Sequence, residues 1–153
     1  MTTMTAQTTQ VYRVYIRATP EQVWDAITKP EFTQEYFHGS VIESDYAAGA
    51  PYRGFSPDGT QQFVDGEVLE ADPPRLLRTT WRALWDPELA EESYGRVSWE
   101  IELAGESVTM LTVVHDELEG APKTAESVAG AGGWSYVLSG LKSVLETGKG
   151  LVA

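Results

Sequence analysis

Residues 132–150 read GGWSYVLSGLKSVLETGKG, and their pattern decides the fold. Apolar residues recur here every three or four positions and form one stripe: Trp134, Val137, Leu138, Leu141, Val144 and Leu145. Gly148 stands where a helix should end, because glycine adopts the left-handed C-terminal conformation at little cost. The stretch predicts an amphipathic helix lying on an apolar surface, and we expect the C-terminal helix to cover roughly residues 124–147.

The composition is that of an ordinary globular protein. The chain has 153 residues, of which 42% are hydrophobic and 22% are charged, enough for one domain with a substantial core. We predict a single domain over residues 10–153 behind a flexible tail, residues 1–9. There is no cysteine, which excludes a disulfide framework and a thiolate metal site.

The net charge of -12 argues against nucleic acid or an anionic membrane as a partner, since both repel an acidic surface. The N-terminus MTTMTAQTTQ lacks the basic and apolar regions of a signal peptide, and no apolar run reaches transmembrane length. We therefore expect a cytoplasmic protein without membrane insertion, as a monomer or a homodimer.

Seven segments have the composition of strands. The residues VSWEIEL alternate, with Val97, Trp99, Ile101 and Leu103 on one face, as one-sided burial of an antiparallel sheet requires. The acidic stretch DPELAEES, residues 86–93, is expected to be a long solvated loop. The expected strands are residues 11–18, 39–44, 51–55, 62–71, 75–83, 95–104 and 107–115.

Two short helices are expected after the first strand. In TPEQVWDAITKP, Thr19 can cap a helix, Pro20 suits its first turn and Gln22 completes a capping box. Residues 30–37 form a second helix-like segment. The element order predicts an α+β helix-grip fold, in which a curved antiparallel sheet of about six or seven strands surrounds the long C-terminal helix.

The chain resembles a known family. VWDAITKPE, GEVLEADPPRLLRTTW, VTMLTVVHDEL and GGWSYVLSGLKSVLETG together are similar to the activator of heat-shock-protein-90 ATPase homologue family. That family belongs to the START-like (SRPBCC, polyketide cyclase/dehydrase-related) superfamily of helix-grip domains. The resemblance covers residues 10–149 and implies a hydrophobic cavity between the sheet and the last helix, where many superfamily members hold lipids, sterols, hormones or polyketides. It does not imply one function.

Aromatic and aliphatic side chains are the best candidates for a binding site. The predicted fold brings together residues from the helix and the sheet, and we expect an entrance where small residues thin the wall at residues 130–133. The alternative interpretation is a filled core that uses large side chains. The expected ligand-binding residues are Trp134, Val137, Leu141, Trp99, Trp81, Val113, His115 and Ile101.

Catalytic and metal-binding motifs are absent, so we expect no catalytic residue, no metal and no cofactor. GWSYV lacks the second glycine of a nucleophile elbow, which predicts that Ser135 is an ordinary exposed residue. GAGGWS does not match a dinucleotide fingerprint, and the two histidines lack the spacing of zinc ligands. His38 is expected in a turn. His115 has two interpretations: a structural histidine hydrogen-bonded at a strand end, or a residue near the cavity mouth.

Paired charges are more simply explained by a solvated surface. Asp65 and Glu67, like the pair Asp116-Glu117, suit acid–base chemistry only when they are buried together. Arg78 and Arg82 bind an acidic head group only if they face inward, and we expect them to be exposed.

Three functions remain open at this stage. The first is a non-catalytic carrier or sensor that binds a small hydrophobic molecule in a regulatory or stress pathway. The second is an enzyme of the polyketide cyclase or aromatase kind, which needs polar groups converging inside the cavity. The third is a chaperone-associated interaction module. The acidic composition disfavours this function, because the chain lacks the basic surface needed to dock onto an acidic partner. We favour the first.

Overall fold

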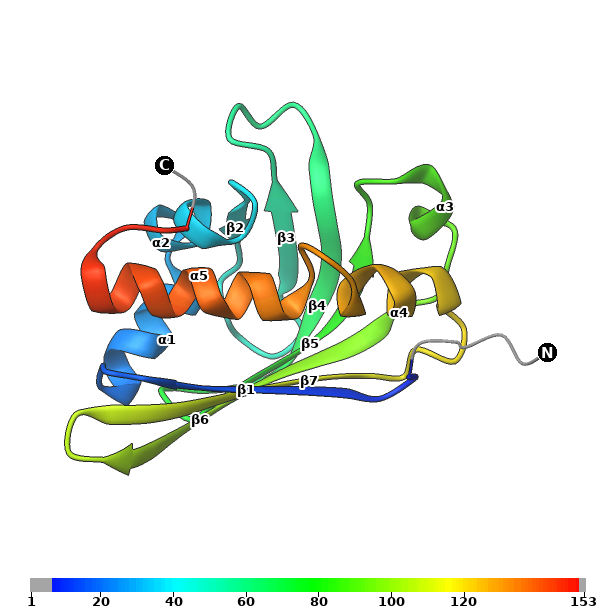
Figure 1. Cartoon of the computed structure of the whole chain (residues 1–153). Coiled ribbons are helices and arrows are strands. Elements are labelled where there is room, and N and C mark those ends of the chain that lie inside the picture. Colours follow the sequence, from blue (N-terminus) through cyan, green and yellow to red (C-terminus); the bar gives the residue numbers. More distant parts are fainter. Residues whose placement is uncertain (1–6, 152–153) are drawn as a thin grey trace.

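The computed structural model describes residues 7–151 and contains a seven-stranded antiparallel sheet with helices on one face (Figure 1). The strand order is β1-β7-β6-β5-β4-β3-β2, so six strands form a meander and β1 adds to its last strand. Each expected strand is present, with ends within two residues of the prediction. The strands are β1 (Gln10–Ile16), β2 (Val41–Glu43), β3 (Pro51–Phe55), β4 (Gln62–Asp72), β5 (Leu76–Ala83), β6 (Gly95–Gly105) and β7 (Val108–Asp116).

Two helices carry the chain from one edge of the sheet to the other. They are α1 (Pro20–Thr28) and α2 (Pro30–Tyr36), and both begin with proline at the first position. The predicted capping box is present: the Gln22 amide N–H donates to the Thr19 hydroxyl (3.2 Å), and the Thr19 amide donates to the Gln22 side chain (2.8 Å). These helices connect the two edge strands, β1 and β2, at one end of the molecule.

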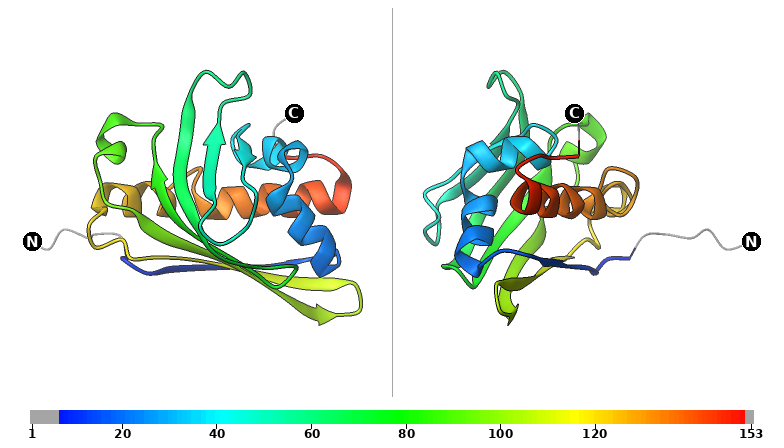
Figure 2. Two further views of the ribbon diagram at one scale, coloured as in Figure 1. Left: turned by 180° about the vertical axis from the view of Figure 1, so that it is seen from behind. Right: turned by 60° about the vertical axis from the view of Figure 1, so that its left-hand side comes forward.

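The C-terminal helix α5 (Trp134–Thr147) lies across the concave face of the sheet and ends at Gly148, whose φ is 83°. Figure 2 shows α1 and α2 at one end of α5, and α3 (Pro87–Ala90) and α4 (Pro122–Ala129) at the other. The helix-grip prediction is therefore confirmed. Within residues 7–151, no helix has the length and apolar character needed to cross a membrane.

The prediction of a single helix over residues 124–147 is wrong, because the helical conformation is interrupted between α4 and α5. Gly132 has a φ of 79°, and a Cβ atom at Gly133 would lie 2.0 Å from the Val128 carbonyl oxygen. Both positions therefore need glycine, and together they redirect the chain before Trp134.

The acidic segment 86–93 is also more ordered than a solvated loop. Asp86 caps α3 by accepting a hydrogen bond from the Glu88 amide (2.8 Å), and Leu89 is buried. The helix forms because an aspartate at the cap, a proline at the next position and one apolar anchor suffice for a single turn.

The sheet face covered by α5 forms the core. Val97, Trp99 and Ile101 are buried there, as their alternation predicts. Leu103 is 62% exposed despite sharing their face, because β6 and β7 extend as a hairpin beyond the helices (Figure 1).

Of the expected tail, residues 1–9, the first six residues lie outside the described part of the chain. Within residues 7–9, the Thr8 carbonyl accepts a hydrogen bond from the Leu118 amide (3.3 Å).

Replacing Leu141 by alanine should lower the free energy of unfolding by about 2–5 kcal/mol. Its side chain is 0% exposed between α5 and the sheet, so truncation leaves a cavity. Chemical denaturation measures the change. Leu103→Ala is the matched control and should cost less than about 1 kcal/mol. Equal losses in the two variants would contradict this placement of the core.

Candidate functional site

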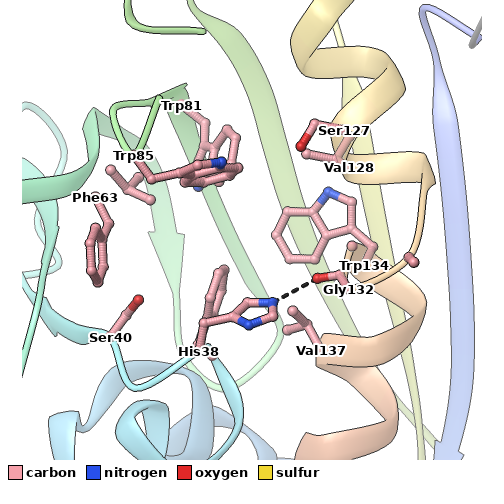
Figure 3. Close-up of a pocket in the computed structure, with 14 residues that line it drawn as sticks. His38, Ser40, Phe63, Trp81, Trp85, Ser127, Val128, Gly132, Trp134 and Val137 are labelled. Carbon is pink, nitrogen blue, oxygen red and sulfur yellow. Dashed lines mark hydrogen bonds between the residues drawn. The ribbon is translucent and has the colours of Figure 1, made fainter. Parts of the chain in front are cut away.

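A pocket of about 330 Å³ lies where the sheet, the end of α2 and the α4–α5 junction meet (Figure 3). Its walls come from segments far apart in the sequence. The lining residues are Phe37, His38, Ser40, Phe63, Val64, Trp81, Trp85, Ser127, Val128, Ala131, Gly132, Gly133, Trp134 and Val137.

The pocket has an apolar inner wall and an exposed rim. Trp81, Val64 and Trp134 are buried and form part of the inner wall, whereas Trp85 is 46% exposed. The Trp85 ring packs edge-on against Trp81, with 5.8 Å between their centroids. A small molecule entering past Trp85 therefore meets mainly aromatic and aliphatic surface.

Polar groups in the lining are few. Ser40 and Ser127 contribute hydroxyls, and His38 contributes an imidazole. Among the described residues that line the pocket there is no aspartate, glutamate, lysine or arginine. The arrangement suits an uncharged ligand, because an unpaired charge in an apolar site is costly.

His38 connects two segments at the rim. Its Nε2 donates to the Gly132 carbonyl oxygen (2.6 Å), and its ring stacks on Tyr136 with a centroid distance of 5.3 Å. His38 lies in the turn between α2 and β2, with a φ of 54°. The expectation of a turn residue is confirmed, but that expectation missed the contact with the α4–α5 junction, 94 residues away.

The predicted ligand-binding residues divide into two groups. Trp134, Val137 and Trp81 line the pocket, as do residues 131–133 of the expected entrance. The other five are buried in the core outside the pocket lining: Leu141, Trp99, Val113, His115 and Ile101. Five further residues of the same pocket were not predicted from the sequence: Phe37, Phe63, Ser40, Trp85 and Ser127.

His115 is fully buried and hydrogen-bonded, as the structural interpretation requires. Its Nδ1 accepts the indole N–H of Trp134 (2.9 Å), so a neutral ring carries its proton on Nε2. That Nε2 has no hydrogen-bond partner among residues 7–151. Burial lowers the pKa of His115 to about 4, although the nearby Asp116 carboxylate acts in the opposite direction.

The candidate charged residues lie away from the pocket. Arg82 pairs with Asp65 (3.6 Å) and Arg78 with Glu70 (3.4 Å), and both arginines are partly exposed. Arg96 forms two hydrogen bonds with Asp116, at 2.7 and 3.0 Å. These carboxylates are thus engaged in ion pairs. Ser135 is exposed on α5, as predicted.

Comparison with protein families agrees with this architecture. Residues 17–146 match the family described as Activator of Hsp90 ATPase homolog 1-like protein. The chain belongs to this family. The resemblance seen in the sequence motifs is therefore confirmed.

Several solved structures share the fold. DynU16, a protein in the dynemicin biosynthetic locus, is 27% identical with a TM-score of 0.74; the match covers 94% of this chain and 49% of DynU16. The chain thus spans about half the length of that protein. MLL2253 from Mesorhizobium loti is 24% identical with a TM-score of 0.71, covering 90% of this chain and 96% of that one.

The Aha1 dimer from Colwellia psychrerythraea is 22% identical with a TM-score of 0.69, and the match covers 94% of this chain and 100% of that chain. Comparison with curated proteins gives no match.

Stability should fall by roughly 2 kcal/mol between pH 7 and pH 5 because of His115. The ordinary histidine pKa is 6.5 and the pKa of His115 in the folded protein is about 4, so in this range the unfolded chain binds the proton more readily. The stabilisation is complete above pH 6.5 and decreases as the pH falls towards 4. Denaturation at each pH measures it.

His115→Gln should flatten this pH dependence while keeping a hydrogen-bond acceptor for Trp134. Leu103→Ala, which replaces an exposed residue and removes no titratable group, is the control and should retain the wild-type slope. A His115→Gln variant with an unchanged slope would show that His115 does not titrate in this way.

Proposed function

We propose that this protein binds a small, uncharged and largely apolar molecule in the pocket beneath the α4–α5 junction, as a carrier or sensor. One observation carries the proposal: a pocket of about 330 Å³ whose lining includes five aromatic rings and no charged side chain among the described residues. Pockets of this size and character are typical of small-molecule sites. Burial of apolar ligand surface against these rings supplies the affinity.

A cyclase of the polyketide kind is the second candidate. It is favoured by the 27% identity to DynU16, which belongs to a biosynthetic locus. Such chemistry needs a base or acid facing the ligand. His38 is the titratable side chain in the described lining, and its Nε2 already donates to Gly132. This engagement favours binding over turnover. Mass spectrometry distinguishes the two, because a carrier releases its co-purified ligand unchanged.

The neutral dye N-phenyl-1-naphthylamine should bind to the pocket, with increased dye fluorescence and quenched tryptophan emission. Trp85→Ala should weaken binding by about 2–10-fold, since one aromatic contact at the rim is lost. Trp85 is suitable because it is half exposed, so its removal should little affect folding.

Tyr15→Ala is the control for this experiment, since Tyr15 is an exposed aromatic residue on β1 outside the pocket lining. It should leave the affinity unchanged. Absence of saturable dye binding to the wild-type protein, or equal weakening by both variants, would refute the proposed site.

A further inference from the structure

We propose that the ligand is a flat aromatic molecule with a hydroxyl or carbonyl oxygen at each of two opposite ends, held by Ser40 and Ser127. This inference rests on the proposed function and specifies the ligand class and the two residues that recognise it.

The walls favour a planar ring system. The lining includes Phe37. Figure 3 shows four further aromatic residues around the space: Phe63, Trp81, Trp85 and Trp134. Several of them already pack edge to face with one another: the Phe37 and Trp134 centroids are 5.7 Å apart, with an interplanar angle of 78°. Aromatic rings prefer such edge-to-face and offset contacts, which a flat ligand can extend with its own faces and edges. A bulky saturated ligand of the same volume lacks these contacts.

Ser40 marks one end of the pocket. It is only 3% exposed, and its backbone is fixed: its amide donates to the Phe37 carbonyl (3.0 Å) and its carbonyl accepts from the Thr33 hydroxyl (2.9 Å). The Ser40 hydroxyl itself has no hydrogen bond to another residue within 7–151, and it points into the pocket (Figure 3). This hydroxyl is therefore available to a ligand, and a ligand oxygen placed there replaces a water molecule with an equivalent hydrogen bond.

Ser127 marks the other end. It lies on α4 and is half-buried, and Figure 3 shows its hydroxyl directed into the pocket from the side opposite Ser40. The Ser127 carbonyl is engaged by the Gly130 amide (3.3 Å), whereas the hydroxyl has no partner in the described part of the chain. The two hydroxyls thus belong to different segments, α4 and the residue before β2, with the aromatic walls between them.

Charge restricts the polar groups of the ligand to neutral ones. The described lining residues include no cation to pair with a carboxylate or phosphate, and the protein carries a net charge of -12. An anionic group would lose its hydration without gaining a partner and would also be repelled by the whole molecule. Serine hydroxyls, in contrast, both donate to and accept from a neutral hydroxyl or carbonyl.

A matched series of naphthalenes tests the inference by calorimetry and tryptophan quenching. The series is naphthalene, 2-naphthol, 2,3-dihydroxynaphthalene, 2,6-dihydroxynaphthalene and 6-hydroxy-2-naphthoate. Each satisfied hydroxyl should tighten binding by about 2–10-fold. The 2,6-isomer should bind more tightly than the 2,3-isomer, whose adjacent hydroxyls reach only one end. The naphthoate should bind more weakly than the 2,6-isomer.

Serine variants assign the two ends. Ser40→Ala and Ser127→Ala should each remove the preference for the 2,6-isomer and leave the affinity for naphthalene unchanged. Ser135→Ala, an exposed serine on α5, is the control and should retain the preference. Thermal unfolding verifies that each variant is folded.

The outcomes separate this inference from the proposed function. If naphthalene binds in the pocket but the two isomers bind equally, or if both serine variants keep the preference, the two-ended ligand is refuted while the apolar site stands. If none of these compounds binds to the wild-type protein, both proposals fail for aromatic ligands.

Discussion

The rest of the structure depends on the packing of Trp134 at the start of α5. The ring contacts Trp81, Trp99 and Phe37, with centroid distances of 6.0, 5.4 and 5.7 Å, so it joins the helix to the sheet and to the end of α2. An indole N–H buried in such a cluster needs an acceptor, and His115 provides it from β7. Burial keeps His115 neutral, and this hydrogen bond fixes its tautomer. Trp134 therefore belongs to both the core and the pocket, and its hydrogen bond to His115 on β7 fixes its position.

Much of the fold is predictable from two sequence patterns, the alternation along strands and the three-to-four-residue spacing along the last helix, because both must bury their apolar residues. A strand with one covered face must alternate, which directed Trp99 and Ile101 inward, and an amphipathic helix must find an apolar surface of its own length. The apolar stripe from Trp134 to Leu145 is long enough to need such a surface, and the concave face of the sheet provides it. The outward direction of Arg78 and Arg82 follows from the same alternation in β5, where Leu77, Thr79 and Trp81 face inward.

The pocket itself was less predictable, because alternation identifies which residues face inward but not which of them meet another side chain. Val113 and Ile101 face inward and are covered by neighbours, whereas Trp81 and Trp134 border open space. That difference depends on Phe63, Trp85 and Ser40, which come from loops or strand ends, where sequence patterns carry little information on direction. A contact such as His38 to Gly132 has no local signature, since its partners are 94 residues apart.

The break in the last helix explains why the space exists at all. A continuous helix over residues 124–147 would carry an unbroken row of side chains along the sheet, and they would fill the groove. Instead, residues 130–133 bring small side chains to this point and redirect the chain, so the backbone itself forms part of the wall. His38 then holds that backbone by its carbonyl at Gly132. The glycines that make the long-helix prediction wrong are thus the same residues that form part of the pocket wall.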